Sequence, residues 1–541
     1  MMKKGILIIG WLIGVVDCLY AQTAPGIEWQ NTIGGSEGDI LQSIQQTTDG
    51  GYILGGYSHS NISGDKTENI NGNFDYWIVK TDSLGSIQWQ NTIGGNHTDR
   101  LYSIQQTADG GYILGGYSGS YISGDKTENC IGNWDYWIVK TDSLGNIQWQ
   151  NTIGGTDDDR LFTIQQTADG GYISGGYSSS NISGDKTENS MGEDDYWIVK
   201  TDSLGQIQWQ NTIGGIDVDR LTSLQQTLDG GYILGGYSWS SISGDKTENF
   251  LGGCDYWIVK TDANGNIQWQ NTIGGNDWDE LYSIQQTSDG GYIFGGDSQS
   301  NISNDKTENS NGSADYWVVK TDMLGNIQWQ NTIGGNNGDI LYSIERTVDD
   351  GYILGGYSLS DISGDKTENR IGWWDYWIVK LDVNGNIQWQ STIGGDTTEY
   401  LYSIQQTIDG GYMLGGYSQS NISGDKTENC IGQYDYWIVK LFPDTVTGII
   451  QLQNQTSNIQ ISPNPSTDYI TIQYNVTSAK ETTVEVFNIY GQVVKPLTSK
   501  GGLQNTGKQE ITIDIKNLPA GIYFVKMKVD GKEEVKKVVK L

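Results

Sequence analysis

A 60-residue period is the feature that most constrains how this chain can fold. A tryptophan recurs at this spacing, at Trp29, Trp89, Trp149, Trp209, Trp269, Trp329 and Trp389. Each copy belongs to a stretch like residues 135–155, DYWIVKTDSLGNIQWQNTIGG, in which two apolar, aromatic runs flank a turn. A period of this size indicates a repeat architecture in which each unit is one supersecondary element.

Each unit contains four candidate strands. In the second unit they are Leu101–Thr107, Gly111–Ser118, Asp135–Thr141 and Ile147–Ile153. A tight Asp-Gly turn joins the first strand to the second, and a second hairpin turn joins the third to the fourth. The connection between the second and third strands is long. Four antiparallel strands per unit, repeated several times, are typical of the blades of a β-propeller.

The two ends of the repeat array are complementary. The array begins with a fourth-strand copy at Ile27–Gln30 and ends with a third-strand copy at Asp435–Leu441. The N-terminal strand can therefore complete the last blade and cover the open sheet edges, whereas an open solenoid gains nothing from this offset. We predict an all-β chain: a seven-bladed β-propeller over residues 27–441, closed by the N-terminal strand, and then a small C-terminal β-sandwich.

Several motifs of the unit resemble the kelch repeat. They are the glycine pair Gly115-Gly116, the strand beginning Asp135-Tyr136-Trp137, the turn after it and Trp149. Kelch units have about 50 residues, and the extra length here lies between the second and third strands. The array looks like a kelch-like propeller of the kind found in secreted proteins of the Bacteroidetes.

The N-terminus has the pattern of a secretory signal peptide at residues 1–21. Lys3 and Lys4 form its charged region, residues 6–16 its apolar core, and Ala21 a small residue before the cut. The apolar run is too short to span a bilayer. We therefore expect no transmembrane segment in the mature chain.

A second domain follows a polar linker at residues 442–458. Residues 459–541 contain ISPNP at 461–465, LPAGIYFVKM at 518–527 and a Lys-rich end. This segment resembles the type A C-terminal sorting domain of the type IX secretion system. The resemblance implies a Gram-negative Bacteroidetes cell, the type IX machinery as partner, and a product that is secreted or held at the outer cell surface. The alternative is a C-terminal β-sandwich that binds a ligand.

The charge balance excludes two classes of partner. The chain has 65 acidic and 32 basic residues, a net charge of −33, and the acidic excess lies in the repeats. Nucleic acid and anionic lipid both require a basic surface, so neither is an expected partner.

Comparing the seven units separates two faces of the predicted ring. The hairpin turns barely change. Changes concentrate in the connection between units, in the residue between two serines after the second strand, and at the end of the long connection. All blades need the same packing, whereas a site for an asymmetric ligand must differ between blades. The variable face is thus the candidate binding face, although loops also vary where nothing constrains them.

Aromatic and histidine side chains of the variable face are the candidate ligand contacts. Exposed aromatic rings stack on sugars or anchor protein partners. The candidates are Trp134, Trp239, Trp278, Trp373, Trp374, Tyr434, His59 and His97.

Two sets of oxygen ligands recur in the units. A carboxylate precedes every first strand, at Asp39, Asp99, Asp159, Asp219, Asp279, Asp339 and Glu399. These side chains either hold cations at the channel mouth or accept backbone N–H bonds, and sevenfold repetition favours the second reading. The long connection offers Asp125, Glu128, Asn129 and Asp135, with their equivalents, for calcium; local turn chemistry explains the same residues.

The sequence gives little support for catalysis. It contains no HExxH motif and no glycine-rich phosphate loop. After removal of the signal peptide three cysteines remain, Cys130, Cys254 and Cys430. They fall in predicted blades that are not neighbours, so we expect no disulfide within the ring.

The favoured hypothesis is a non-enzymatic binding or adhesion module for glycan or protein. The alternatives are a glycan-active lyase or hydrolase on the variable face and a purely structural envelope component.

Overall fold

The computed structural model describes residues 23–444, 459–462, 466–476, 483–488, 493–497, 507–519, 521–529 and 532–540. The predicted signal peptide and most of the predicted linker lie outside these residues. The chain divides into two compact units, Met1–Thr447 and Gly448–Leu541. Among the described residues, no helix is long and apolar enough to cross a membrane.

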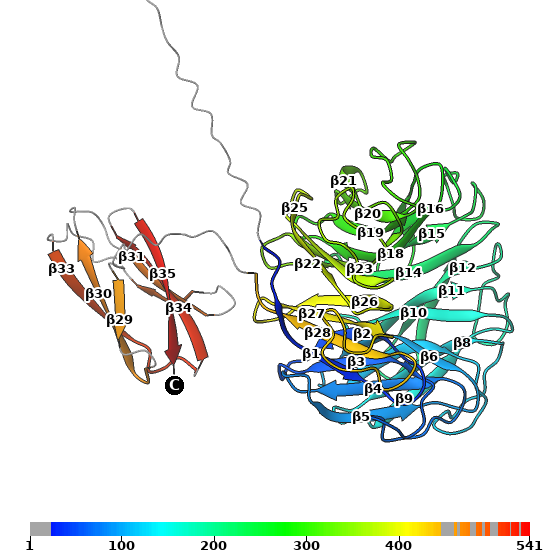
Figure 1. Cartoon of the computed structure of the whole chain (residues 1–541), viewed down its shortest axis with the longest axis horizontal. Helices are drawn as coiled ribbons and strands as arrows, with labels where there is room; N and C mark the ends of the chain where they lie inside the picture. The colour runs from blue at the N-terminus through cyan, green and yellow to red at the C-terminus, as the bar shows by residue number, and fades with distance from the viewer. Residues whose placement is uncertain are drawn as a thin grey trace, which may run out of the picture. The chain divides into compact units, whose positions relative to one another are not determined.

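The larger unit is built from seven four-stranded antiparallel sheets (Figure 1). In sheets 1 to 6 the strands follow chain order, and within each sheet each pairs with the next. Sheet 1 contains β2 (Asp39–Gln46), β3 (Tyr52–Ser58), β4 (Asp75–Thr81) and β5 (Ile87–Ile93). Sheet 2 contains β6 (Asp99–Gln106), β7 (Tyr112–Ser118), β8 (Asp135–Thr141) and β9 (Ile147–Ile153). Sheet 3 contains β10 (Asp159–Gln166), β11 (Tyr172–Ser178), β12 (Asp195–Thr201) and β13 (Ile207–Ile213). Sheet 4 contains β14 (Asp219–Gln226), β15 (Tyr232–Ser238), β16 (Asp255–Thr261) and β17 (Ile267–Ile273). Sheet 5 contains β18 (Asp279–Gln286), β19 (Tyr292–Ser298), β20 (Asp315–Thr321) and β21 (Ile327–Ile333). Sheet 6 contains β22 (Asp339–Arg346), β23 (Tyr352–Ser358), β24 (Asp375–Leu381) and β25 (Ile387–Ile393).

Sheet 7 joins the two ends of the repeat array. Its strands are β26 (Glu399–Gln406), β27 (Tyr412–Ser418), β28 (Asp435–Leu441) and β1 (Ile27–Ile33). Strand β1 lies antiparallel to β28, with Ile33 opposite Tyr436 and Trp29 opposite Lys440. The N-terminal strand therefore completes the last sheet, as the offset of the array predicts.

Burial explains the composition of each strand. The third strands, such as DYWIVKT in β8, are buried at every position because sheets pack against both faces. The tryptophan of this strand, Trp137 in β8, is among the largest fully buried side chains. The fourth strands form outer edges and are only partly buried along most of their length, as in β9. First strands of successive sheets contact one another and lie innermost.

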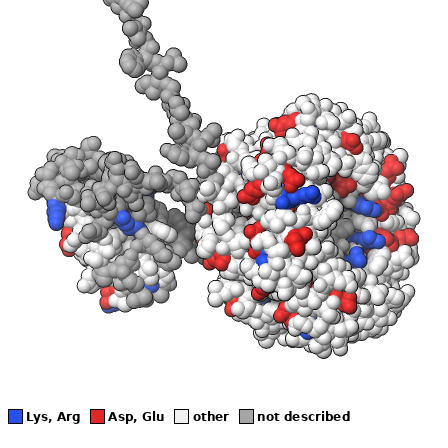
Figure 2. All heavy atoms as spheres, viewed as in Figure 1, with Lys and Arg blue, Asp and Glu red and all other residues white. Residues whose placement is uncertain are grey.

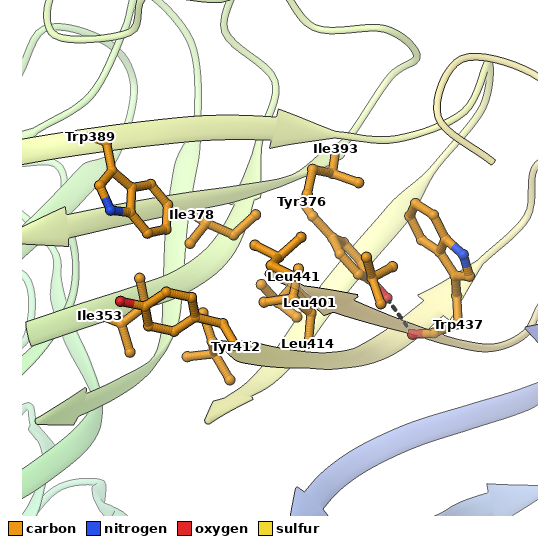
Figure 3. Close-up of a cluster of buried hydrophobic side chains, with 12 residues drawn as sticks. Ile353, Tyr376, Ile378, Trp389, Ile393, Leu401, Tyr412, Leu414, Trp437 and Leu441 are labelled. Atoms are coloured by element: carbon orange, nitrogen blue, oxygen red, sulfur yellow. Dashed lines mark hydrogen bonds between the residues drawn. The ribbon is translucent and has the colours of Figure 1, made fainter. Parts of the chain in front are cut away.

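Two series of hydrogen bonds link each sheet to the next. In one, the tyrosine of a third strand donates to the carbonyl of the next tryptophan, as from Tyr376 Oη to Trp437 O at 3.0 Å (Figure 3). In the other, a glutamine side chain accepts a backbone N–H, as from Gln106 N to Gln45 Oε1 at 2.6 Å. Both series also join sheet 7 to sheet 1, through Tyr436 and through Gln405. The contacts thus run through all seven sheets and return to the first.

The predicted bounds of the first and second strands differ from the structure, by two residues or fewer at each end. Strand β6 begins at Asp99, two residues before the prediction, because Asp99 pairs with Ser118 at the end of β7. Its backbone N–H also donates to Phe74 O at 2.6 Å. Asp99 therefore belongs to the strand, although a charged residue at this place predicts the preceding loop.

The described residues of the smaller unit form two sheets. Strands β29, β30 and β33 form one, and β32, β31, β34 and β35 the other. Their bounds are β29 (Ile459–Ser462), β30 (Tyr469–Val476), β31 (Thr483–Asn488), β32 (Val493–Leu497), β33 (Gly507–Asp514), β34 (Gly521–Val529) and β35 (Lys532–Lys540). Buried residues from both sheets, such as Ile472 and Val525, form one core. The prediction of an all-β chain with repeated four-stranded antiparallel sheets is confirmed.

Candidate functional site

The two ends of each sheet in the larger unit carry different connections. At one end, the long loop between second and third strands meets the connection that enters the sheet; for example, Asp159 N donates to Trp134 O at 2.7 Å. We call this end the loop face. The other end carries the two hairpin turns of sheets 1 to 6 and the one hairpin turn of sheet 7, and we call it the turn face. The variable residues that the sequence comparison singled out lie on the loop face, and a further variable position, that of Ala108 and Leu228, lies in a turn of the turn face.

A cavity of about 610 Å³ opens on the loop face between the loops of sheets 1, 2 and 3. It is lined by Asn73, His97, Thr98, Gly119, Tyr121, Gly132, Asn133, Trp134 and Asp158. Two of the predicted contacts, His97 and Trp134, are thus brought together. A Cβ atom at Gly119 would lie 3.2 Å from the indole of Trp134, so glycine at this position leaves room for the ring.

Trp134 is fixed from two sides. Its ring lies edge-on to Tyr117, with centroids 5.3 Å apart, and the guanidinium of Arg160 lies 5.6 Å from its centroid. The indole is half-buried, so part of it stays accessible from the cavity. His97 is exposed and lies edge-on to Tyr121 at 6.0 Å. The cavity therefore combines aromatic surface with amide, hydroxyl and imidazole groups.

The other predicted contacts form separate groups. Trp239 and Trp278 lie edge-on at 5.6 Å, and Trp278 is 43% exposed. Trp373 is 66% exposed, whereas its neighbour Trp374 is half-buried against a tyrosine at 5.1 Å. The sequence prediction placed these residues on one face, and the structure distributes them over several sheets of it.

Tyr434 and His59 have local roles. Tyr434 is half-buried, 5.5 Å from Tyr417, and occupies the space beside Gly38. His59 is exposed, packs on Phe74 at 5.0 Å and bonds through Nδ1 to the carbonyl of Asn73. Neither residue lines the cavity described above.

Three arginines on the inner strands were missed by the sequence reasoning. Arg100, Arg160 and Arg220 are the second residues of β6, β10 and β14, so they occupy equivalent positions in three consecutive sheets. The other four sheets have Ile40, Glu280, Ile340 and Tyr400 there. Comparing the units along the strands, and not only along the loops, would have revealed this variation.

The arginines alternate with aromatic rings. Arg100 lies 5.1 Å from the centroid of Phe74 and 5.2 Å from that of Tyr57. Arg160 lies over Tyr117 at 5.3 Å, and Arg220 lies over Tyr177 at 4.9 Å. We call these three arginines, with Tyr57, Phe74, Tyr117, Trp134 and Tyr177, the arginine–aromatic strip.

The arginines of the strip differ in their ion pairs. Arg160 pairs with Asp158 at 2.9 Å and Arg220 with Asp194 at 2.8 Å. Among the described residues, Arg100 has no carboxylate partner, and its hydrogen bond is a long one, from Nη1 to Tyr117 Oη at 3.4 Å. The Nε atoms of Arg100 and Arg160 are buried without a partner in the described structure.

The next sheet carries acidic groups at the corresponding positions. Glu280 stands directly opposite Asp297 across the β18–β19 pair, and Asp297 replaces the tyrosine of the other units. Burial and the neighbouring carboxylates raise the pKa of Asp297 well above its ordinary value. Tyr282 Oη donates to Glu280 Oε2 at 2.5 Å. On the visible side in Figure 2, acidic groups are scattered over the larger unit, and basic groups gather in a few places.

The calcium candidates each bind groups of the chain itself. Asp125 Oδ2 accepts from Gly94 N at 3.2 Å and Glu128 Oε2 from Thr152 N at 2.6 Å. Asn129 Oδ1 accepts from Ile122 N at 2.9 Å, and Asp135 Oδ2 from Ile131 N at 2.5 Å. No group of three or more His, Cys, Asp or Glu side chains suited to a metal occurs among the described residues. The side-chain oxygens of these four residues thus accept hydrogen bonds from backbone N–H groups of the chain itself.

The carboxylates at the start of the first strands are fully buried. Asp39 Oδ2 accepts from Gly35 N at 2.6 Å and from Ser60 Oγ at 3.1 Å. Burial raises the pKa of this carboxyl to about 6. The geometry therefore supports the structural alternative, in which these carboxylates accept hydrogen bonds from backbone N–H groups. The cysteines Cys130, Cys254 and Cys430 are free thiols.

Comparison with known protein families assigns the C-terminal segment. Residues 442–541 match the family described as the secretion system C-terminal sorting domain. The chain carries a sorting domain. The protein is therefore secreted or displayed at the cell surface, and this domain engages the type IX secretion machinery. The predictions of the sorting domain and of export are confirmed.

Two further similarities are limited. A segment of the chain is 27% identical over 141 residues to the regulatory protein FlaEY of Caulobacter vibrioides, and it covers 25% of this chain and 15% of that protein. A solved structure of glycoside hydrolase family 32 from Bifidobacterium adolescentis has 7% identity, a TM-score of 0.24 and 95% coverage of both chains. At that score the likeness supports no conclusion about fold or activity.

Proposed function

We propose that this protein is a secreted or surface-displayed binding module, in which a kelch-like, seven-bladed propeller meets a glycan or protein ligand through its loop face. The propeller interpretation rests on the pairing of β1 with β28 and on the two hydrogen-bond series that return from sheet 7 to sheet 1. Export by the sorting domain places the larger unit where extracellular ligands are present.

The cavity beside Trp134 is the observation that carries this proposal. Its wall combines a partly accessible indole with amide, hydroxyl and imidazole groups. Such a mixture is typical of sites that bind a sugar or a protein side chain. The position of Trp134 is held by Phe74, Asp194, Cys254, Ala314, Trp374 and Tyr434 in the other units. Tryptophan is thus not required there for the fold, which favours a role in binding.

Binding without catalysis fits the residues of the cavity. Glycoside hydrolysis ordinarily uses two carboxyl groups on opposite sides of the scissile bond. Among the described residues that line this cavity, Asp158 is the one carboxylate, and it pairs with Arg160.

One observation favours a glycan-active enzyme as the second candidate. Glu280 and Asp297 face each other across two antiparallel strands, which places their Cβ atoms about 5 Å apart. The raised pKa of Asp297 would suit a general acid. A reducing-end assay on a panel of polysaccharides separates the candidates. We expect no cleavage; cleavage that is lost in Glu280→Gln would establish the enzyme.

A glycan and protein array with the purified full chain tests the binding proposal. We expect saturable binding to at least one ligand, and a loss of at least about tenfold in affinity for Trp134→Ala. Ala314 stands at the equivalent position, so the variant should fold with an unchanged melting temperature. Trp374→Ala is the matched control, because this equivalent tryptophan does not line the cavity. Equal losses in both variants, or no binding by the parent chain, would contradict the proposal.

A further inference from the structure

Guanidinium groups are rare in this chain and are concentrated in one place. The chain has five arginines, Arg100, Arg160, Arg220, Arg346 and Arg370. Three of them lie in the arginine–aromatic strip, at the loop-face ends of consecutive inner strands. In a chain of net charge −33 such a concentration is not a general property of the surface.

Shared aromatic rings connect the three arginines into a continuous surface. Tyr117 receives the hydrogen bond of Arg100 and lies beneath Arg160. Tyr177 lies 5.9 Å from Arg160 and 4.9 Å from Arg220. Stacking on aromatic faces holds a guanidinium in place while its edge keeps N–H donors free for a ligand.

Arg100 is the group of this strip with the most unused hydrogen-bonding capacity. It lacks a carboxylate partner among the described residues, whereas Arg160 and Arg220 each have one. A guanidinium carries five N–H donors in a planar fork that matches a carboxylate or a sulfate in two parallel bonds. Its buried Nε atom has no partner in the described structure. This arrangement is suited to an anion.

The strip adjoins the cavity. Trp134 belongs to both, since its indole lines the cavity and packs under Arg160. Asp158 also lines the cavity and forms the ion pair with Arg160. Thr98 lies in the cavity wall two residues before Arg100. A ligand whose ring lies on Trp134 would therefore carry its neighbouring substituents toward the guanidinium groups.

We propose that the strip and the cavity form one site for an acidic polysaccharide, in which Trp134 stacks on a sugar ring and Arg100, with Arg160, binds the carboxylate or sulfate of that sugar or its neighbour. This inference rests on the proposed binding function and specifies its ligand class. Apolar stacking and charged bidentate recognition together match an anionic sugar better than a neutral one.

Titration calorimetry of the full chain with three polymers tests this inference. The probes are oligogalacturonate for carboxylate, dextran sulfate oligomers for sulfate, and neutral dextran of similar length. We expect at least one acidic probe to bind at least about tenfold more tightly than dextran. Tighter binding of oligogalacturonate assigns a carboxylate, and tighter binding of dextran sulfate assigns a sulfate. Equal affinity for dextran and both acidic probes would overturn the inference.

Arg100→Ile is the decisive variant. Isoleucine occupies the equivalent position at Ile40 and Ile340, so the variant should keep its melting temperature. We expect a loss of about tenfold or more for the acidic probe and little change for dextran, with Arg100→Lys intermediate because it keeps the charge and loses the fork. Arg370→Gln is the charge-matched control, since this arginine pairs with Asp361 in the long loop of another sheet.

The outcomes also separate this inference from the proposed function. If the array finds a neutral glycan or protein ligand and neither acidic probe binds, the inference fails and the binding function stands. If no ligand binds on the array or in solution, both fail. Equal weakening by Arg100→Ile and Arg370→Gln would show general charge attraction and would overturn the site.

Discussion

Single residues on the loop face vary without moving the backbone that carries them. Phe74 and Ala314 stand at equivalent positions, yet each carbonyl accepts the N–H of the next inner strand, at 2.6 Å from Asp99 and at 2.8 Å from Asp339. The hydrogen bond fixes the chain whatever the side chain is. Side chains at these positions are therefore free to differ between sheets, whereas the packed positions of the third strands are not.

A pair of tryptophans three residues apart tests this difference. Trp134 is half-buried and its side chain is dispensable in another unit, so Trp134→Ala should change the free energy of unfolding by less than about 1 kcal/mol. Trp137 is fully buried between sheets, and Trp137→Ala should destabilise the chain by about 3–5 kcal/mol through the cavity it leaves. Denaturant unfolding measures both. Similar losses would contradict the separation of scaffold from site.

Glu345 is a second residue whose effect can be isolated. It replaces the inner-strand glutamine of the six other units and accepts the N–H of Gln406 at 2.9 Å. Burial raises its pKa from 4.5 to about 7. The native chain therefore holds a proton that the unfolded chain releases between these values, so stability falls as pH rises from about 4.5 to 7 and stays low above.

Glu345→Gln should remove this contribution. We expect the variant to be more stable than the parent by about 1–3 kcal/mol at pH 8 and nearly equal to it at pH 4.5. Thermal unfolding across pH 4.5 to 8 measures the difference. Gln285→Glu is the reciprocal control, and it should introduce the same loss at high pH. A stability difference independent of pH would contradict the assignment.

At the scale of strands and sheets, most of the fold could be predicted from the sequence. The third and fourth strands have the predicted bounds, since the apolar run in DYWIVKT and the hairpin turn at residues 142–146 fix them locally. The start of the first strand was predicted two residues too late. Asp99 is held by its pairing with Ser118 and by a hydrogen bond to Phe74 of the preceding sheet, and the local sequence pattern shows neither contact. The arginines were missed because every strand residue was interpreted as a core residue. The first strands lie innermost, and their second residues lie among the loop-face side chains. The cavity depends on which loops meet in space, and a single sequence does not give that.

Removing the N-terminal strand that completes sheet 7 tests the role of β1. Strand β1 buries Ile33 completely and Trp29 partly against sheets 7 and 1. A chain beginning at Gly34 should lose several kcal/mol of stability, at about 1.5–3 kcal/mol per buried large apolar side chain, and expose the edge of β28. Calorimetry and light scattering measure unfolding and aggregation. A chain of undiminished stability would show that β1 is not needed.

At the scale of the whole molecule, the chain divides its tasks between its two units. The sorting domain at residues 442–541 directs export, and the seven sheets carry the variable loops. The sheets provide seven equivalent positions at each end. On the turn face one residue of the turn after the first strand varies, as Thr48, Ala108, Ala168, Leu228, Ser288, Val348 and Ile408. On the loop face several positions of each unit vary, and some of them line a cavity. We infer that recognition depends on the loop face, where the variable side chains line a cavity.

Binding by two variants of sheet 2 tests that central claim most directly. Trp134 precedes strand β8 on the loop face, and Leu144, which is 68% exposed, follows β8 on the turn face. The measurement is the affinity of the full chain and of Trp134→Ala and Leu144→Ala for a ligand found on the array. We predict a loss of at least about tenfold for Trp134→Ala and an unchanged affinity for Leu144→Ala. Loss of binding in Leu144→Ala with retention in Trp134→Ala would contradict the claim.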